Sequence, residues 1–221
     1  MMIPIRDNLK THRTPIVNYA LIGINVLVFL WMFLNTGNLE QIYSQYALVP
    51  ADFSIINLFT SMFMHGGWMH MIGNMLYLWI FGDNIEDRMG HIGFLLFYLA
   101  GGVAAAMLQV AINPSSTIPM VGASGAIAAV LGAYLVLYPQ SRVYTFVPIG
   151  FFTRLTLMPA IVVLGLWFLL QLFSGVGSLG APDQGGTAYF AHIGGFVFGL
   201  VVGWLVKKRG REPQPAPPTW S

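Results

Sequence analysis

The amino-acid sequence predicts an all-α membrane protein with six transmembrane helices. Hydrophobic residues make up 56% of the chain, charged residues only 8%, and the mean hydropathy is +0.69. A helix needs roughly 20 residues to cross about 30 Å of hydrocarbon, and six segments are apolar over close to that length. These segments are residues 15–34, 66–82, 92–112, 120–138, 155–174 and 188–206. The second is short, and the apolar run 58–64 before it can supply an extra turn.

The basic residues orient these segments. All ten Lys and Arg residues precede the first segment, follow the sixth, or lie between the second and third or the fourth and fifth. The opposite loops, 35–57, 113–119 and 175–187, contain neither Lys nor Arg. Because cytoplasmic loops retain basic residues, both termini are predicted to be cytoplasmic. The net charge of +2 then reflects topology, and nucleic acid is not an expected partner.

The segments divide the chain into three parts. Residues 1–14 are predicted to form a cytoplasmic N-terminal segment, residues 15–209 the six-span membrane domain, and residues 210–221, which contain four prolines, a disordered cytoplasmic tail. The first segment is too long for a secretory signal and lacks a prompt cleavage site, so it is predicted to be an uncleaved anchor. The outer loop 35–57 has the spacing of short amphipathic helices that rest on the membrane, although a packed connector fits equally well.

Polar side chains inside the apolar segments are candidate functional residues, because an unpartnered polar group costs free energy in lipid. Ser124, His192, His70 and Asn74 are such residues, and His65 lies at the outer edge of the second segment. His70 and Asn74 are four residues apart, so they share one helix face. Three further amides are interpreted as hydrogen-bonding partners between helices: Asn18, Asn25 and Gln109.

These residue types favour hydrolysis without a metal or cofactor. The chain has no cysteine, no His-Glu-x-x-His sequence and no carboxylate inside a predicted span, which leaves too few ligands for a metal hydrolase. A serine in a span is usually a packing residue, but Gly122 and Gly125 flank Ser124 and permit a tight turn that exposes backbone amides. A serine nucleophile also needs a neutral imidazole as base, which His192 or His70 can supply. Since no carboxylate is available as a third member, this chemistry would depend on a dyad.

The pattern resembles the rhomboid family of intramembrane serine proteases over almost the whole chain. The resemblance rests on His65-x4-His70-x3-Asn74, Glu86-x-Arg88, Gly122-x-Ser124-Gly125 and His192-x2-Gly195-x3-Gly199. It implies that Ser124 is the nucleophile and His192 the general base. It further implies that His70 and Asn74 form an oxyanion hole with the backbone amide of Ser124, and that His65 supports the same polar pocket.

The resemblance also implies a six-helix, rhomboid-like bundle in a bacterial inner membrane, with loop 35–57 embedded as the first outer loop. Glu86 and Arg88 would be structural residues at the cytoplasmic end. Segments 155–174 and 175–187 would move to admit the membrane segments of single-span or polytopic substrate proteins. One position departs from the pattern: some bacterial members have a tyrosine four residues after the nucleophile, stacked on the catalytic histidine, where this chain has Ala128.

Two other functions fit the same spans. A non-catalytic protein of this fold could bind membrane proteins and hand them over, and a small transporter could use His70, Asn74 and His192 to bind a solute or relay protons. The chain keeps both Ser124 and His192, which disfavours an inactive member. It also lacks the paired, interrupted helices expected of an inverted-repeat transporter.

Overall fold

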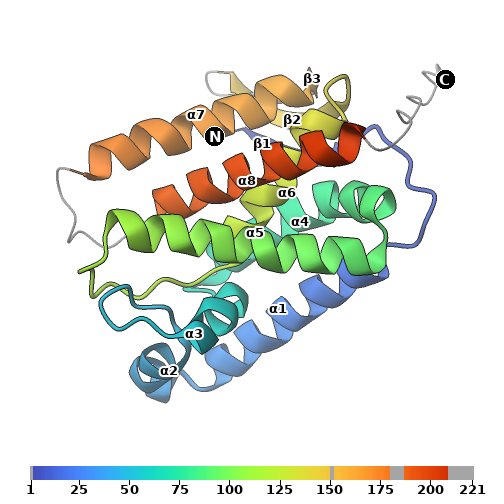
Figure 1. Cartoon of the computed structure of the whole chain (residues 1–221). Helices are drawn as coiled ribbons and strands as arrows, with labels where there is room; N and C mark the ends of the chain where they lie inside the picture. Colours follow the sequence, from blue (N-terminus) through green and yellow to red (C-terminus); the bar gives the residue numbers. More distant parts are fainter. Residues whose placement is uncertain (1, 150–151, 180–186, 209–221) are drawn as a thin grey trace.

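The computed structural model describes residues 2–149, 152–179 and 187–208, and most of these residues are helical (Figure 1). The predicted tail at 210–221 lies outside the described residues, as does the stretch 180–186 of the last outer loop. The main helices are α1 (Ile16–Leu34), α4 (Trp68–Met89), α5 (His91–Ile112), α6 (Ser124–Leu137), α7 (Ala160–Ser178) and α8 (Tyr189–Lys208). The first loop contains η1 (Thr36–Asn38), α2 (Leu39–Tyr46), α3 (Ile55–Thr60) and η2 (Ser61–Phe63).

Helix α6 lies at the centre of the bundle and contacts α4, α5 and α8. Eleven of its 14 residues are buried, most of them small or aliphatic. Small residues also face it from α8: a Cβ atom at Gly199 would lie 2.7 Å from the carbonyl carbon of Ala129, and one at Gly195 would lie 3.1 Å from that of Gly125. The backbones of α6 and α8 therefore pack in direct contact, as small residues in membrane helices allow.

Four of the described helices are long and apolar enough to cross a membrane: α1, α5, α7 and α8. Their large hydrophobic side chains are exposed on the outside of the bundle, for example Leu27, Leu170 and Phe173. A surface of this kind is stable against lipid and unstable in water, so the chain is an integral membrane protein. Helix α4 has charged residues near its C-terminus and α6 is short, so neither qualifies by itself, and the six-span count stays a prediction.

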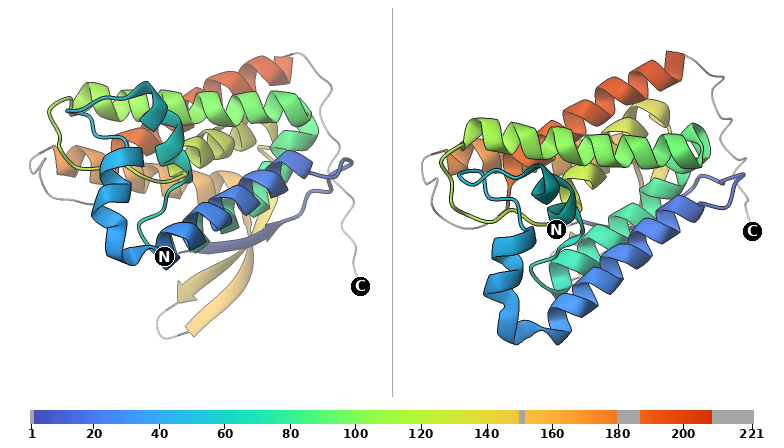
Figure 2. Two further views of the ribbon diagram at one scale, coloured as in Figure 1. Left: turned by 90° about the horizontal axis from the view of Figure 1, so that it is seen from below. Right: turned by 60° about the horizontal axis from the view of Figure 1, so that its bottom comes forward.

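The prediction of an all-α chain is wrong at the end of the bundle that was predicted to be cytoplasmic. Strands β1 (Ile3–Asp7), β2 (Arg142–Ile149) and β3 (Phe152–Pro159) form an antiparallel sheet in the order β1-β2-β3, with Tyr144 opposite Leu157. The β2–β3 hairpin projects from the helical body (Figure 2). Both strands are rich in β-branched and aromatic residues, which fit a pleated surface. As a result α7 begins at Ala160, and residues 155–159 of the predicted fifth span belong to β3.

The fourth predicted span is also shorter than expected. Residues 120–123 are not helical, because Met120 pairs with Leu48 and the Gly122 N–H donates to the Ser61 carbonyl at 2.9 Å. These bonds to the first loop satisfy backbone groups that would otherwise belong to a helix. Helix α6 consequently begins at Ser124 itself.

The first loop, residues 35–67 between α1 and α4, packs against the bundle at the lower left of Figure 1. Ile42 of α2 is buried in a small cluster with Met32, Ala47 and Met64. Ile55 and Ile56 of α3 are largely exposed. The loop is therefore a packed element with an apolar outer side, and its position relative to the membrane stays a prediction.

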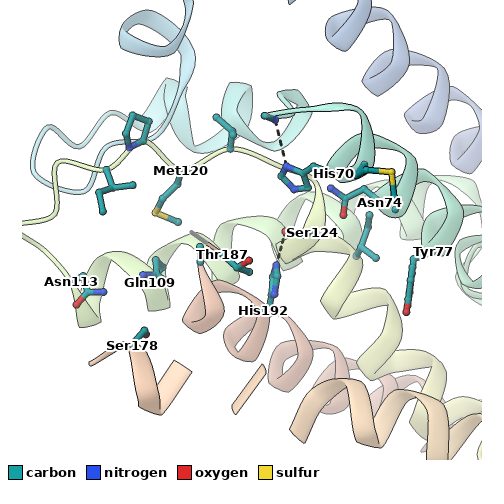
Figure 3. Close-up of a pocket in the computed structure, with 18 of the residues that line it drawn as sticks. His70, Asn74, Tyr77, Gln109, Asn113, Met120, Ser124, Ser178, Thr187 and His192 are labelled. Carbon is teal, nitrogen blue, oxygen red and sulfur yellow. Dashed lines mark hydrogen bonds between the residues drawn. The ribbon is translucent and has the colours of Figure 1, made fainter. Parts of the chain in front are cut away.

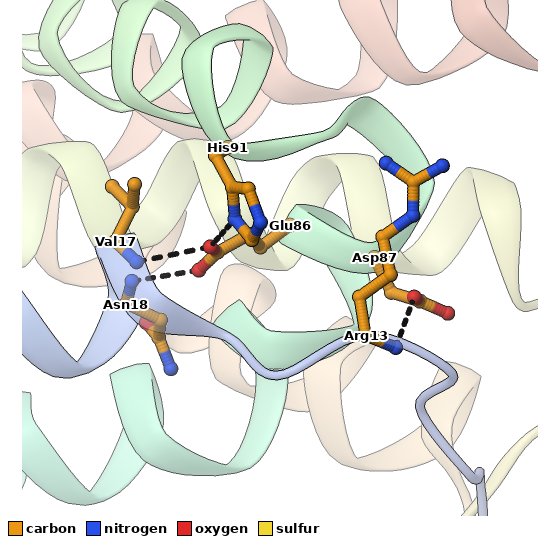
Figure 4. A network of polar contacts seen from close by, with 6 residues as sticks. All are labelled: Arg13, Val17, Asn18, Glu86, Asp87 and His91. Atoms are coloured by element: carbon orange, nitrogen blue, oxygen red, sulfur yellow. Dashed lines mark hydrogen bonds and ion pairs between the residues drawn. The ribbon is translucent and has the colours of Figure 1, made fainter.

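Glu86 holds the start of α1 against the end of α4 (Figure 4). Its carboxylate is buried and accepts hydrogen bonds from the Val17 N–H at 2.9 Å and the Asn18 N–H at 2.7 Å, and it contacts the His91 ring. These amides belong to the first turn of α1, where backbone N–H groups have no hydrogen-bond partner within the helix. A carboxylate is the favoured group at this positive end of the helix dipole. Arg88 lies in the last turn of α4, where a basic side chain is favourable for the same reason.

Candidate active site

Ser124 and His192 are joined by a hydrogen bond between α6 and α8. The Ser124 hydroxyl lies 2.7 Å from Nε2 of His192 (Figure 3). Ser124 is the first residue of α6, and His192 lies in the first turn of α8 with 8% of its surface exposed. The close packing of Gly195 and Gly199 on α6 brings the two side chains within hydrogen-bond distance.

The turn before Ser124 requires glycine. Gly122 has a φ of +129°, in the region that residues with a Cβ atom rarely adopt. A Cβ atom there would also lie 2.8 Å from the His70 ring. This turn presents the Ser124 N–H at the start of α6, where the first four amides have no partner within the helix. Gly125 is needed for packing instead, since a Cβ atom would lie 2.6 Å from that of Ala105.

His70 and Asn74 lie on the other side of Ser124, on one face of α4 (Figure 3). Nδ1 of His70 accepts a hydrogen bond from the Gly66 N–H at 3.5 Å, which leaves the proton on Nε2, beside Gly122. The side-chain amide nitrogen of Asn74 is buried and has no hydrogen-bond partner within the described residues. Two donors are therefore available near the serine hydroxyl. His65 is buried next to them, with its ring centre 5.1 Å from that of His70.

His192 is held from its other side by α7, a contact that the sequence analysis did not anticipate. Nδ1 of His192 lies 2.7 Å from Oε1 of Gln171, and the Trp167 ring lies 5.6 Å from the imidazole ring, tilted by 35°. Trp167 therefore supplies an aromatic neighbour that Ala128 does not. Like Asn18, Asn25 and Gln109, Gln171 is a polar residue in an apolar segment. The same criterion could therefore have identified it from the sequence.

Gln109 fixes the start of α8 from α5. Its Oε1 atom accepts hydrogen bonds from the backbone N–H groups of Phe190 and Ala191, at 3.1 and 3.2 Å. It thereby replaces the missing partners of the first turn of α8. The predicted role of Gln109 between helices is confirmed, as is that of Asn18, which donates to the Leu78 carbonyl at 3.1 Å. Asn25 instead donates to the Leu21 carbonyl of its own helix, at 2.7 Å.

A cavity of about 550 Å³ contains these groups. Ser124, His192, His70 and Asn74 all line it. Its lining also includes polar residues from the predicted outer ends of the helices and the loops that follow: Gln109, Asn113, Ser116, Ser178 and Thr187. Apolar side chains, including Trp167, Ile127 and Leu131, line other parts. The cavity has room for an extended peptide segment and polar groups that can bind water.

Among the sequence-predicted site residues, the structure brings together His65, His70, Asn74, Gly122, Ser124 and His192, with Gly125, Gly195 and Gly199 at the helix contacts beside them. Glu86 and Arg88 lie apart from this group, near the C-terminus of α4. Glu86 bonds to the first turn of α1 there, and the roles expected of both residues stay predictions. Within the described residues, three or more His, Cys, Asp or Glu side chains do not cluster as a metal site would require.

Comparisons with known proteins identify the family of the chain. The Rhomboid domain family model matches residues 52–209. The chain is 30% identical to Rhomboid protein 1, mitochondrial, of Saccharomyces cerevisiae over 93% of its own length and 57% of that protein. It is 30% identical to Rhomboid protease GluP of Bacillus subtilis (75% of this chain, 32% of that protein), and 29% identical to the human Presenilin-associated rhomboid-like protein, mitochondrial (85% and 46%). The chain thus spans about a third to somewhat over half of these relatives, and it belongs to the rhomboid family.

Proposed function

We propose that this protein is a serine endopeptidase that cleaves transmembrane or juxtamembrane segments of other membrane proteins. The observation that carries the proposal is the 2.7 Å contact between the Ser124 hydroxyl and Nε2 of His192, inside a cavity that also contains two hydrogen-bond donors. A nucleophile, a base and stabilising donors in one cavity constitute the machinery for acyl transfer. The name of one relative, Rhomboid protease GluP, supports the same reaction.

In the proposed reaction, the Ser124 oxygen attacks the carbonyl carbon of the scissile peptide bond while Nε2 of His192 accepts the hydroxyl proton. The C–N bond then breaks, and the imidazolium returns the proton to the leaving amine. A water molecule, activated by the same nitrogen, hydrolyses the resulting ester and restores the serine. The reaction requires no metal and no cofactor.

The negative charge on the carbonyl oxygen would develop beside Gly122. The backbone N–H of Ser124, Nε2–H of His70 and the side-chain amide of Asn74 are the donors on that side of the serine. The first turns of α4, α6 and α8 all lie at the cavity, and the positive ends of their dipoles favour an anion there. Loss of one such donor typically lowers kcat by about 100- to 1,000-fold.

The membrane arrangement belongs to the same proposal. Helices α4 and α6 complete six spans, both termini are cytoplasmic, and the cavity opens to the outer side, where water enters past Gln109 and Asn113. The first loop rests at the outer surface, and the substrate helix unwinds to bring its backbone to Ser124. A bacterial inner membrane fits the resemblance to bacterial-type members, whereas mitochondrial relatives occur among the similar proteins.

The test is cleavage of a labelled single-span protein by the purified chain in liposomes. Wild-type protein should cleave it and react with a serine-directed phosphonate, and Ser124→Ala and His192→Ala should do neither. Ser44→Ala is the matched control, since the Ser44 hydroxyl donates only to the Gln41 carbonyl in α2, outside the cavity. Cleavage that persists in Ser124→Ala would contradict the proposal. Binding of the substrate without cleavage or labelling would instead favour a handover factor, and solute flux that survives Ser124→Ala would favour a transporter.

A further inference from the structure

We infer that Gln171 of α7 is the positioning residue for His192. Its side-chain amide takes the position that a carboxylate has in a Ser-His-Asp triad. This inference rests on the proposed function, because it concerns the proton that His192 would accept. The observation is a chain of contacts from three helices: Gln171 Oε1 to His192 Nδ1 at 2.7 Å, and His192 Nε2 to the Ser124 hydroxyl at 2.7 Å.

The contact with Gln171 determines which ring nitrogen carries the proton. An amide oxygen can only accept a hydrogen bond, so Nδ1 of His192 must donate to it. In a neutral imidazole the other nitrogen, Nε2, is then unprotonated and accepts from the Ser124 hydroxyl. This is the tautomer that a general base needs. The opposite tautomer would place a hydrogen on Nε2, facing the hydroxyl, and could not take its proton.

Gln171 acts together with Trp167, four residues earlier on α7. Residues with this spacing share one helix face, and here both contact the same imidazole. The indole ring restricts rotation of the imidazole, and the amide oxygen fixes its proton. His192 is 8% exposed, and a neutral amide serves here without bringing a second charge into the apolar interior.

The orientation of His192 consequently depends on a helix with little packing of its own. Only four of the 19 residues of α7 are buried: Ala160, Val163, Leu164 and Gly175. Many others are exposed at the surface, among them Leu169, Leu170 and Phe173. If α7 moved away from α8, His192 would lose its Nδ1 acceptor and its aromatic neighbour at once. The base is therefore oriented only when α7 is in place.

Kinetics with two variants test the role of Gln171. Gln171→Leu keeps the approximate size and removes the acceptor, and should lower kcat about tenfold with little change in KM. Gln171→Glu should raise the pH of the acidic limb of kcat/KM by about one unit, because a carboxylate stabilises the imidazolium. Leu170→Ala, on the exposed side of α7, is the control and should match wild type. Wild-type kcat in Gln171→Leu together with an unmoved pH profile in Gln171→Glu would overturn the inference.

A spectroscopic measurement separates this inference from the proposed function. Nitrogen-15 spectra of histidine-labelled protein in micelles, with His192 assigned by comparison with His192→Ala, report which ring nitrogen is protonated. Wild type should show a protonated Nδ1 and an unprotonated Nε2, and Gln171→Leu should show a mixture of tautomers. An unchanged tautomer in Gln171→Leu, or a protonated Nε2 in wild type, would refute the role of Gln171. Because the spectrum needs no turnover, it remains decisive for Gln171 even if Ser124→Ala shows that the chain is not a protease.

Discussion

Substitution of a single glycine on α8 tests whether backbone contact between α6 and α8 sets the geometry of the site. A Cβ atom at Gly199 would lie 2.7 Å from the carbonyl carbon and 2.8 Å from the Cα atom of Ala129, and closer still to the carbonyl oxygen. Carbon atoms pack at about 3.5–4.0 Å, so the helices must separate by about 1 Å in Gly199→Ala. Ser124 and His192 lie on these same two helices, and their 2.7 Å hydrogen bond would lengthen.

The expected effects on stability and on activity are both measurable. Overpacking of this kind costs about 3 kcal/mol, offset by about 1 kcal/mol because alanine favours a helix over glycine. The net loss of about 2 kcal/mol corresponds to a fall of about 4–8 °C in apparent Tm for a chain of this size. A misplacement of about 1 Å lowers catalytic rates by about 100-fold.

The assay combines thermal melting in detergent with cleavage of the labelled substrate. Gly23→Ala on α1 is the matched control, because apart from the adjoining backbone of α1 no atom lies within 4 Å of the position its Cβ would take. It should be as active as wild type and slightly more stable. If Gly199→Ala melted and cleaved like Gly23→Ala, direct contact of the α6 and α8 backbones could not be what positions Ser124 and His192.

Two further predictions concern the C-terminal end of α4 and strand β1, which packs against α4. Glu86→Ala should lower the free energy of unfolding by about 2–4 kcal/mol, because it leaves two α1 amides without a partner. Asp87→Ala should lower it by less than about 1 kcal/mol, since water replaces its exposed bonds to the His12 and Arg13 amides. Equal losses of the two variants in melting experiments would contradict this prediction. Burial raises the pKa of Asp7 to about 6 despite hydrogen bonds from Tyr134 and Asn84.

The sign of the Asp7 effect follows from proton binding. Between about pH 4 and pH 6 the folded protein holds a proton on Asp7 that the unfolded chain releases, so the free energy of unfolding falls as pH rises, by at most about 3 kcal/mol. Burial, and then the Asp7 carboxylate, also raise the pKa of the neighbouring Asp83, so its titration changes the stability with the same sign. Asp7→Asn should flatten the change in Tm over this range relative to wild type. An equal slope in both proteins would count against the buried carboxyl as its source.

The sequence allowed the chemically distinctive residues to be predicted, because polar groups are conspicuous in an apolar segment. Ser124, His192, His70 and Asn74 were expected to meet, and the structure brings them together in one cavity. The roles assigned to them stay predictions. Gln171 was missed although it is equally conspicuous, because a carboxylate was sought as the third member and an amide was not. The contact of Trp167 with His192 depends on how α7 is rotated against α8, which the sequence of either helix alone does not determine.

The sheet was missed for a different reason. Residues 155–159 are apolar and continue directly into α7, so composition alone assigns them to the fifth span. Their conformation is decided by pairing with β2, which in turn pairs with β1 at the start of the chain. Tertiary context of this kind overrides local hydrophobicity. The hydrogen bonds of Asp7 with Tyr134 and Asn84 explain why β1 is held against the bundle. These residues lie far apart in the sequence, so no local pattern predicts that they meet.

The short length of α6 connects the fold to the proposed chemistry. Fourteen residues at about 1.5 Å each span about 21 Å, roughly 9 Å less than the hydrocarbon core of a bilayer. The C-terminus of α6 leads into the sheet on the predicted cytoplasmic side, so the missing length falls at the other end, where Ser124 begins the helix. The non-helical residues before it, bonded to the first loop through Met120 and Gly122, border the cavity that this shortening leaves. A full-length helix would fill that space with side chains and leave water no room beside the serine, so the short helix is what would make the proposed hydrolysis physically feasible.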